Sequence, residues 1–540
     1  MTQYDVIIRG GTVYDGSGWP ASVADLAIRG DTIAAIGALG ADRAQTEIDA
    51  AGLAVAPGFI NMLSWAAEAL IADGRSQSDI RQGVTLEVFG EGVSLGPLTA
   101  EMKQTQRERQ GDITYDISWT TLDEGLQQLV GRGISPNVAS FVGATTLREH
   151  TVGHADRAPT ADELDAMRRL TREAMEDGAL GVGSSLIYAP ACYADTDEMI
   201  ALAEVAAAYG GMYISHIRNE GARLLEAIDE LVTIARRSGA PAEIWHLKAA
   251  GPANWHKLHA TLERVEAARA EGLRITADMY TYSASSSGLD ATMPGWVQEG
   301  GHRAWVARLR DPAVRARLRN ELSRVSAQQQ NEFLGAEKIL LIGFRNDALK
   351  PLTGKSLAEV AAMRGTSPED TIMDLIVEDD SRVGCVFFTM SEDNVRTAIG
   401  TPWVSFCSDS QSLAPEGVFL KSSTHPRAYG SFARLLGTYV RDQRIIPLEE
   451  AVRRLSAFPA ENLGLERRGR LKPGHYADVV VFDPDKVRDH ATYDRPHQYA
   501  SGVQHVFVNG TQVLKNGEHT DARPGRVLRG RGVRMTRRRT

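Results

Sequence analysis

The feature that most constrains this fold is an alternation of short apolar runs with amphipathic stretches along the middle of the 540-residue chain. Stretches with helical spacing of apolar residues, such as 161–178 and 197–210, separate many of these runs. Buried strands that alternate with helices form parallel sheets. Eight runs therefore predict an α/β fold built on a closed (β/α)8 barrel. The runs are 54–63, 85–90, 137–143, 180–188, 212–217, 242–249, 274–280 and 403–409.

Both ends of the chain have a different pattern, in which apolar and polar residues alternate as they do in half-buried strands. This pattern covers residues 4–37, where glycines mark the turns. It returns at 474–485 and at 503–518, where Asn509 and Gly510 form a hairpin signal. We therefore expect the two ends to pair with each other.

These patterns predict a division of the chain into two units. Residues 1–58 and 468–540 are predicted to form a small composite β-sandwich. Residues 59–467 are predicted to form the barrel. More material than one helix needs lies around 295–395, between the seventh and eighth runs, and we expect it to be an insertion that partly covers the barrel mouth.

Composition argues against several classes of partner. The net charge of −9 disfavours nucleic acid and anionic membranes as partners. No run has the length of a membrane span, and the N-terminus lacks the apolar core of an export signal. The three cysteines, Cys192, Cys385 and Cys407, form no disulfide framework and suit a cytoplasmic location. The basic end, 529–540, is expected to be a solvated tail. The oligomeric state is not predicted.

Four polar residues follow different runs in the place where a barrel carries its active site. Glu91 follows the second run, His216 ends the fifth, and His246 lies in the sixth. Asp409 ends the eighth run. Two histidines and one glutamate are a known ligand set for catalytic zinc, with a fourth position left for water. Asp409 could then act as the base that takes the proton of that water.

Each of these residues also has a simpler interpretation. Glu91 could be a loop carboxylate or a helix cap. His216 and His246 could each be a hydrogen-bonded core histidine. Asp409 could be a turn residue. Convergence of all four at strand ends favours the metal site.

At these residues the chain resembles the N-acyl-D-amino-acid deacylases (D-aminoacylases) of the amidohydrolase superfamily. The resemblance runs nearly from end to end. It rests on several motifs: "GALGVGSSLIYAPACYADTDEM", "YISHIRNEG", "HLKAAG", "TADMYTYSASSSGL", "HPRAYGSFARLLGTYVRD" and "PAENLGLERRGRLKPGHYADVVVFDP". It implies a β-sandwich around a (β/α)8 barrel, with histidine ligands at His216 and His246 and a catalytic aspartate at Asp409.

The chain departs from this family at two places. The resemblance implies a His-x-His pair after the first strand, where this chain has Leu63 and Trp65, so a second metal site is not expected. It also implies a cysteine ligand where this chain has Glu91. We expect one divalent metal, with Zn²⁺ as the first choice; the harder oxygen ligand leaves Mn, Fe or Co as alternatives.

The carboxylate of an N-acyl amino acid needs cationic or hydroxyl partners. Lys248 and Arg427 are the candidate cations, although each could instead form a structural ion pair. His425 could contact substrate or only orient its loop. By resemblance, the remaining candidates are Tyr188, Tyr280, Tyr282 and Ser287.

The expected function is hydrolysis of the linear amide of N-acyl-D-amino acids to a carboxylate and a free amino acid. Metal-bound hydroxide would attack the carbonyl, and Asp409 would act as general base and then as general acid. Two alternatives stay open: a related amide, dipeptide or cyclic-amide hydrolase, and a catalytically inactive binding protein. The expected partner is therefore a small N-acyl amino acid.

Overall fold

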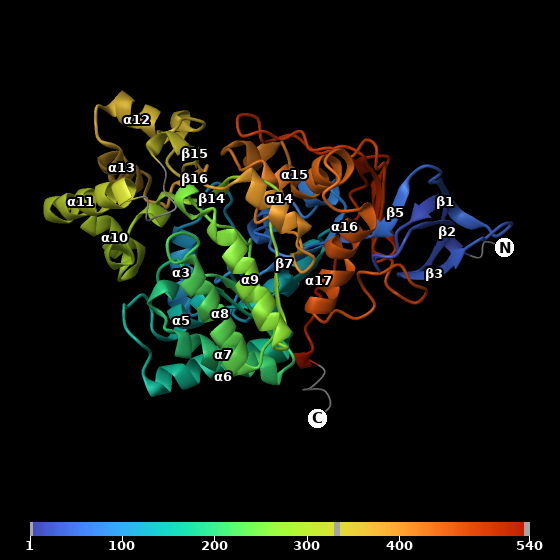
Figure 1. Cartoon of the computed structure of the whole chain (residues 1–540), viewed down its shortest axis with the longest axis horizontal. Helices are drawn as coiled ribbons and strands as arrows, with labels where there is room; N and C mark the ends of the chain where they lie inside the picture. Colours follow the sequence, from blue (N-terminus) through green and yellow to red (C-terminus); the bar gives the residue numbers. More distant parts are fainter. Residues whose placement is uncertain (1–3, 329–334, 534–540) are drawn as a thin grey trace.

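The computed structural model of the protein describes residues 4–328 and 335–533, with side chains left undescribed at 324–328. Most of the basic C-terminal stretch, 534–540, lies outside the described residues, so its assignment as a tail stays a prediction. Figure 1 shows three regions along the long axis: terminal strands at one end, a helix-rich body with its own strands at the other, and the main α/β body between them.

The two ends of the chain share one nine-stranded sheet, in the order β20-β19-β18-β17-β5-β1-β2-β3, with β4 on β1. The junction is an antiparallel pairing of β5 with β17, in which Val55 faces Val481. The strands are β1 (Tyr4–Val13), β2 (Ser22–Arg29), β3 (Thr32–Gly37), β4 (Ala44–Asp49), β5 (Ala54–Pro57), β17 (Val479–Phe482), β18 (Val503–Val508), β19 (Thr511–Lys515) and β20 (Glu518–His519). The predicted pairing of the two ends is therefore observed.

The strands of the middle pair in parallel and in chain order, as β6-β7-β8 and as β9-β10-β11-β12-β13. β8 and β9 are two halves of one run, interrupted at Phe141, whose N–H donates to the Phe89 carbonyl at 2.9 Å. The strands are β6 (Phe59–Asn61), β7 (Val84–Phe89), β8 (Asn137–Ser140), β9 (Val142–Gly143), β10 (Gly181–Ser185), β11 (Met212–His216), β12 (Ala242–Ile244) and β13 (Ile275–Ala277).

The eighth run lies between the last and the first of these strands. Val404 pairs with Ala277, the last residue of β13. Ser410 pairs with Ser64, which lies just after β6. Two expectations need correction here. The eighth run is an irregular segment held by isolated bridges, and the first run divides, so that β5 joins the terminal sheet while β6 joins the middle one.

Helices follow most of the parallel strands, and local sequence explains where they begin. α6 starts after Thr160, whose side chain caps the helix reciprocally with Glu163, and it ends at Gly178 in the left-handed conformation. These helices are α1 (Ala67–Ala72), α2 (Gln77–Ile80), α3 (Ala100–Glu108), α4 (Leu122–Arg132), α5 (Ala144–Thr151), α6 (Ala161–Asp177), α7 (Thr196–Ala208), α8 (Leu224–Ser238), α9 (Lys257–Ala270), α14 (Glu392–Gly400), α15 (Arg427–Arg434), α16 (Leu448–Leu455) and α17 (Ala457–Asn462).

Residues 285–387 contain a second small body, which overlaps the predicted insertion. Its antiparallel sheet has the order β14-β16-β15, from β14 (Ser285–Gly288), β15 (Ile339–Gly343) and β16 (Gly384–Phe387). Its helices are α10 (Gly301–Arg308), α11 (Pro312–Gln328), α12 (Leu357–Arg364) and α13 (Pro368–Asp379). Its apolar side chains form a cluster separate from the main core, which includes Leu289, Trp305 and Leu341.

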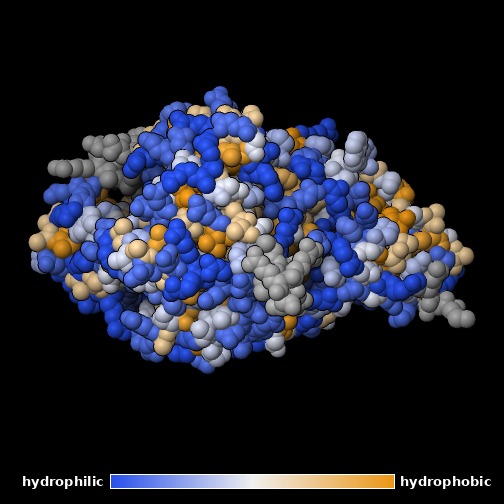
Figure 2. Space-filling view, turned by 90° about the horizontal axis from the view of Figure 1, so that it is seen from below, coloured by the Kyte–Doolittle hydropathy of each residue, from blue (hydrophilic) through white to orange (hydrophobic). Residues whose placement is uncertain are grey.

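The face shown in Figure 2 is mostly hydrophilic, and apolar colour gathers toward the end that carries the terminal strands. Exposed apolar residues on the N-terminal segment include Trp19 and Val23, which are 76% and 74% exposed. In the part of the chain that is described, no helix combines the length and the apolar character needed to cross a membrane.

Candidate metal centre

Glu91 is placed by the turn that follows β7. Gly90 and Gly92 flank it, and both have a positive φ that favours glycine. A Cβ on Gly90 would lie 2.5 Å from the Phe141 carbonyl oxygen, and one on Gly92 would lie 2.6 Å from the Ser185 hydroxyl oxygen. The two glycines therefore let the backbone turn tightly beside the next strands, with the Glu91 side chain 4% exposed.

The two histidines come from neighbouring parallel strands. His216 is the last residue of β11, and His246 follows the end of β12. His246 has a φ of +39°, which is rare for a residue with a side chain. Its N–H donates to Oδ1 of Asp278 at 2.7 Å, which holds the unusual backbone in place.

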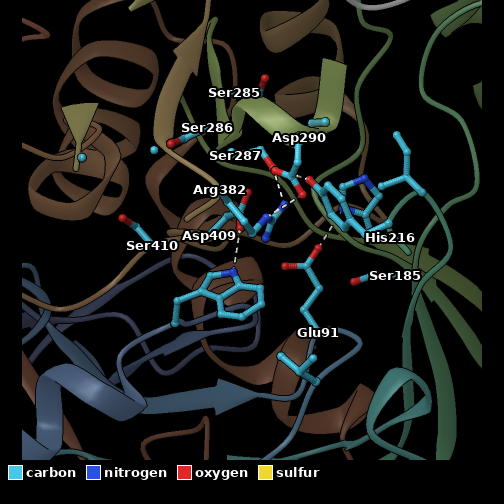
Figure 3. A pocket seen from close by; sticks show the side chains of 18 of the residues that line it. Glu91, Ser185, His216, Ser285, Ser286, Ser287, Asp290, Arg382, Asp409 and Ser410 are labelled. Carbon is cyan, nitrogen blue, oxygen red and sulfur yellow. Dashed lines mark hydrogen bonds and ion pairs between the residues drawn. The ribbon is translucent and has the colours of Figure 1, made fainter. Parts of the chain in front are cut away.

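Glu91, His216 and His246 converge on one point. Oε1 of Glu91 lies 2.8 Å from Nδ1 of His216 (Figure 3). The same oxygen lies 2.9 Å from Nε2 of His246. The ligand atoms of the three residues all lie within 4.8 Å of one another, and no other group of three such residues occurs among residues 4–328 and 335–533. Two imidazoles and one carboxylate at this spacing fit a divalent metal ion.

The charges around this cluster favour an ionised carboxylate. Burial by itself would raise the pKa of Glu91, but the two histidines hold it well below its usual range. Burial likewise disfavours a charge on His246, but the carboxylates of Glu91 and Glu220 outweigh this and raise its pKa to about 10. Without an ion, an ionised Glu91 therefore pairs with a protonated His246, and a bound metal cation would replace that proton, because a ligating imidazole is neutral.

Sequence reasoning did not select Glu220, which is a neighbour of this cluster. Oε1 of Glu220 lies 3.2 Å from Nδ1 of His246 and 3.7 Å from Nε2 of His216. It also lies 2.5 Å from Nζ of Lys248. The only sequence signal for Glu220 was its place four residues after His216, on the loop that leaves β11.

Asp409 faces the same cavity from the eighth segment (Figure 3). Both of its carboxylate oxygens have a cationic or N–H neighbour: Nε1 of Trp65 lies 3.2 Å from Oδ1, and an Nη atom of Arg427 lies 2.8 Å from Oδ2. Its φ of +48° is a second strained backbone position at this site. Leu63, two residues before Trp65, is fully buried in an apolar cluster.

A cavity of about 930 Å³ opens beside these residues, and it contains most of the candidates chosen from sequence. The metal candidates and Asp409 line it, and so do Lys248, Tyr188, Tyr280, Ser287 and Arg427. Tyr188 donates to or accepts from the Ser287 hydroxyl at 2.9 Å, which joins the main body to β14.

Two candidates lie outside the lining of this cavity. The hydroxyl of Tyr282 donates to Asp489 at 3.0 Å, and the ring is 4% exposed. His425 is held between the Ala284 carbonyl at 3.0 Å and the N–H of Arg427 at 2.9 Å. Both side chains thus contact neighbouring protein groups rather than line the cavity, and His425 contacts the start of α15; a role of either in substrate binding stays a prediction.

Arg382 also lines the cavity, although no sequence motif indicates it. Its Nε lies 2.7 Å from Oδ2 of Asp290, and its Nη2 donates to the Ser287 hydroxyl at 3.3 Å. Its guanidinium carbon lies 5.0 Å from the centre of the Tyr188 ring. An isolated arginine in an insertion has no motif around it, and only the folded chain brings it to the cluster (Figure 3).

The fold and this site define an α/β protein with a candidate metal centre. Comparisons with known proteins identify the family to which it belongs. The model of the amidohydrolase family matches residues 103–514. D-aminoacylase of Alcaligenes xylosoxydans xylosoxydans is 33% identical over 526 residues, with 97% of each chain covered. N-acyl-D-glutamate deacylase of the same organism is 34% identical, over 97% of this chain and 96% of that protein.

Solved structures agree with these matches. N-acyl-D-glutamate deacylase from Bordetella bronchiseptica, complexed with zinc and a phosphonate inhibitor, has a TM-score of 0.80 and 32% identity, over 98% of this chain and 100% of that one. A D-aminoacylase described as having a binuclear metal centre, with one-metal activation and second-metal attenuation, has the same score and identity over 97% of this chain and 100% of that one. The protein belongs to the amidohydrolase family.

Proposed function

We propose that this protein is a metal-dependent hydrolase that cleaves the linear amide of N-acyl-D-amino acids. The observation that carries the proposal is the convergence of Glu91, His216 and His246 beside Asp409, in a chain similar over its whole length to D-amino-acid deacylases. The products would be a carboxylate and a free D-amino acid.

The architecture that supports this activity is a closed (β/α)8 barrel of residues 59–467, with the insertion around 295–395 beside its mouth. Parallel pairing in chain order and the bridges of the eighth segment to both neighbours support closure. Residues 1–58 and 468–540 would form the composite β-sandwich, for which the shared terminal sheet is the support. The three cysteines are free, which is consistent with a reducing, cytoplasmic compartment.

Glu91, His216 and His246 would hold one divalent metal ion, with zinc as the first choice. When bound, such an ion acts as a Lewis acid toward a carbonyl and lowers the pKa of a water molecule toward neutrality. The two positions after β6 offer no ligand for a second ion, since Leu63 has an apolar side chain and Trp65 has only an indole N–H, which is a donor. This would distinguish the protein from the relative with the binuclear centre.

Asp409 would be the proton-transfer group. The N–H of Trp65 and the guanidinium of Arg427 hold its carboxylate in one orientation toward the cavity. An ionised carboxylate held in this way can take a proton from the attacking water and then give it to the departing amine. Its strained backbone supports a functional role, because such conformations persist where surrounding structure imposes them.

The substrate carboxylate would bind near Arg382 rather than at Lys248 or Arg427, the two cations expected from the sequence. Lys248 is engaged by Glu220, and Arg427 is engaged by Asp409. Arg382 uses one edge of its guanidinium for Asp290, and the Ser287 hydroxyl beside it lies at the cavity wall. A planar guanidinium with a neighbouring hydroxyl suits a carboxylate.

The test is a screen of N-acetyl derivatives of D- and L-amino acids with protein loaded with zinc, together with metal analysis. We expect about one metal per chain and hydrolysis of the D series. Asp409→Asn should retain the metal and lose most activity, whereas Glu91→Ala should lose both. Glu149→Gln, which changes a cavity carboxyl outside the cluster, is the matched control.

The same screen separates the alternatives. Activity confined to dipeptides or cyclic amides would assign the protein to a related hydrolase. Zinc-free protein that binds N-acyl amino acids but cleaves none would identify a binding homologue. Either result would overturn the proposal.

A further inference from the structure

Each of the two candidate metal-binding histidines has a second ring nitrogen, which faces away from Glu91. We call it the outward nitrogen. It is Nε2 in His216 and Nδ1 in His246, because the other nitrogen of each ring lies 2.8 or 2.9 Å from Oε1 of Glu91. A neutral imidazole that binds a cation through one nitrogen carries its proton on the other. The proposed metal centre therefore presents two outward N–H groups that need acceptors.

One carboxylate lies beside both outward nitrogens. Oε1 of Glu220 lies 3.2 Å from Nδ1 of His246, within hydrogen-bonding distance, and 3.7 Å from Nε2 of His216. Nε2 of His216 is buried and forms no hydrogen bond within the described part of the chain. Glu91 completes a ligand group with the two histidines, whereas Glu220 does not, so Glu220 contacts the rings from outside the cluster.

Lys248 is the other polar neighbour of His246 at this nitrogen. Its Nζ lies 2.7 Å from Nδ1 of His246 and 2.5 Å from Oε1 of Glu220, and both Lys248 and Glu220 are buried. A lysine ammonium can only donate, so it offers no acceptor to an outward N–H. Its positive charge also opposes any cation that the same ring holds. Of these two neighbours, only Glu220 can accept from His246, and it also supplies the counter-charge of Lys248.

The loop that carries Glu220 is held by contacts of its backbone. The N–H of Ala250, in the loop that follows β12, donates to the Glu220 carbonyl at 2.8 Å. On the same loop, Oδ1 of Asn219 accepts from the N–H groups of Gly221 at 3.0 Å and Arg223 at 2.8 Å. None of these contacts uses the Glu220 carboxylate, so a variant without the carboxylate should keep the loop in place.

We propose that Glu220 is a positioning residue for the metal centre. It accepts from the outward N–H of His246, which fixes the orientation of that ring, and it neutralises Lys248, whose charge would otherwise weaken metal binding. The inference rests on the proposed metal site of Glu91, His216 and His246. A carboxylate that accepts from a ligating histidine raises the basicity of the imidazole as a ligand.

Zinc titration of the metal-free protein, with a chelating dye as competitor, tests this role without measuring activity. Glu220→Ala should weaken zinc binding by about 10- to 100-fold. Glu220→Gln keeps an acceptor oxygen but no charge, so it should weaken binding by a smaller factor. Glu226→Ala, which changes an exposed glutamate on α8, is the matched control and should bind zinc like the unchanged protein. Unchanged zinc affinity in Glu220→Ala would overturn the inference.

A variant of Lys248 separates this role from a merely structural one. Lys248→Met alone should bind zinc at least as tightly as the unchanged protein, because the opposing cation is gone. Combined with Glu220→Ala, it should recover part of the affinity that Glu220→Ala loses. If the carboxylate of Glu220 only stabilised its loop, removal of Lys248 would recover nothing. Equal zinc affinity in Glu220→Ala and in the double variant would therefore contradict the proposal.

A second comparison keeps the proposal testable if Glu220→Ala does not fold. A buried cation that has lost its partner is costly, and Glu220→Ala leaves Lys248 in this state. Neither Lys248→Met nor the double variant contains this cation. The double variant should bind zinc about tenfold or more weakly than Lys248→Met, because it lacks the acceptor for the outward N–H of His246. Equal zinc affinity of these two variants would overturn the positioning role.

These measurements make the inference separable from the proposed function. If zinc affinity follows the expected order but no N-acyl-D-amino acid is cleaved, the role of Glu220 is supported and only the proposed reaction fails. If the protein cleaves such substrates while its zinc affinity does not depend on Glu220, the proposed function stands and the positioning role of Glu220 is wrong.

Discussion

The indole N–H of Trp65 lies 3.2 Å from Oδ1 of Asp409. The side chain that holds the candidate proton-transfer group thus comes from 344 residues earlier in the sequence. Arg427 holds the other oxygen at 2.8 Å. By resemblance, Trp65 and Leu63 stand where relatives have a histidine pair. We therefore expect the indole N–H and the guanidinium, rather than a second metal ion, to fix the orientation of this aspartate.

Trp65→Phe tests this relation directly. We expect kcat to fall by a factor of about 10 to 100 with little change in KM, because one hydrogen bond to a carboxylate is worth roughly 1.5–3 kcal/mol. Steady-state kinetics on an N-acetyl-D-amino acid measure the change, with the exposed Trp19→Phe as the control. Unchanged kinetics would show that the indole N–H does not position Asp409.

The double variant Leu63→His with Trp65→His should create a second metal site. The bound zinc should rise from about one to about two ions per chain when zinc is in excess. Mass spectrometry of the metal content measures this without reference to activity. Leu63→Met with Trp65→Phe, which adds no ligand, is the matched control and should stay at one ion, whereas an unchanged ratio in the histidine variant would contradict the inference.

Glu91→Cys should preserve metal binding and change metal preference. A thiolate is a softer ligand than a carboxylate, so the variant should favour zinc over manganese more strongly than the unchanged protein. Competition of the two metals followed by elemental analysis gives the ratio. Glu91→Gln, which cannot ionise, should weaken binding of both metals; equal retention of zinc in this variant would remove Glu91 from the ligand set.

The free energy of unfolding should fall as pH rises from about 5 to 8, because the buried Glu243 keeps its proton only in the folded state. Burial, with the nearby charge of Asp278, raises the pKa of Glu243 from 4.5 to about 8. The folded state therefore holds a proton that the unfolded state has lost, and the free energy of unfolding decreases across this window. Urea unfolding at the two pH values should differ by roughly 1 to 3 kcal/mol from this group.

Glu243→Gln should reduce the slope of this dependence, because the amide does not ionise; Asp278 and Glu87, whose pKa values burial raises to about 7, would keep part of it. The amide can still accept from Thr276 and Asn462, which contact Oε2 of Glu243 at 2.5 and 3.2 Å. Glu173→Gln on the exposed face of α6 is the control and should keep the slope. A slope that persists unchanged in Glu243→Gln would assign the pH dependence to other groups.

The sequence predicts the features that depend on local pattern and strand order. The mixed α/β architecture is confirmed, and Glu91, His216 and His246 meet because each follows a buried run and parallel strands end at one edge. Helix bounds such as those of α6 follow from capping residues that are visible in the sequence.

Features that depend on packing between distant segments were not predictable. Arg382 reaches the cluster only because β14 and β16 pair, which brings Ser287 opposite Cys385. Tyr282 and His425 belong to motifs near the site, but their contacts with Asp489 and Ala284 turn them away from the cavity. No periodicity encodes such contacts, because each depends on how two separate elements dock.

The pairing of β5 with β17 also constrains how the protein is made. An N-terminal segment with exposed strand edges must wait for its partner until nearly the whole chain has left the ribosome. Such edges are prone to association with other chains during this interval. In a nascent chain that stalls before β17, the edge of β5 would therefore stay unpaired. Chaperones that bind extended segments would be expected to cover this edge.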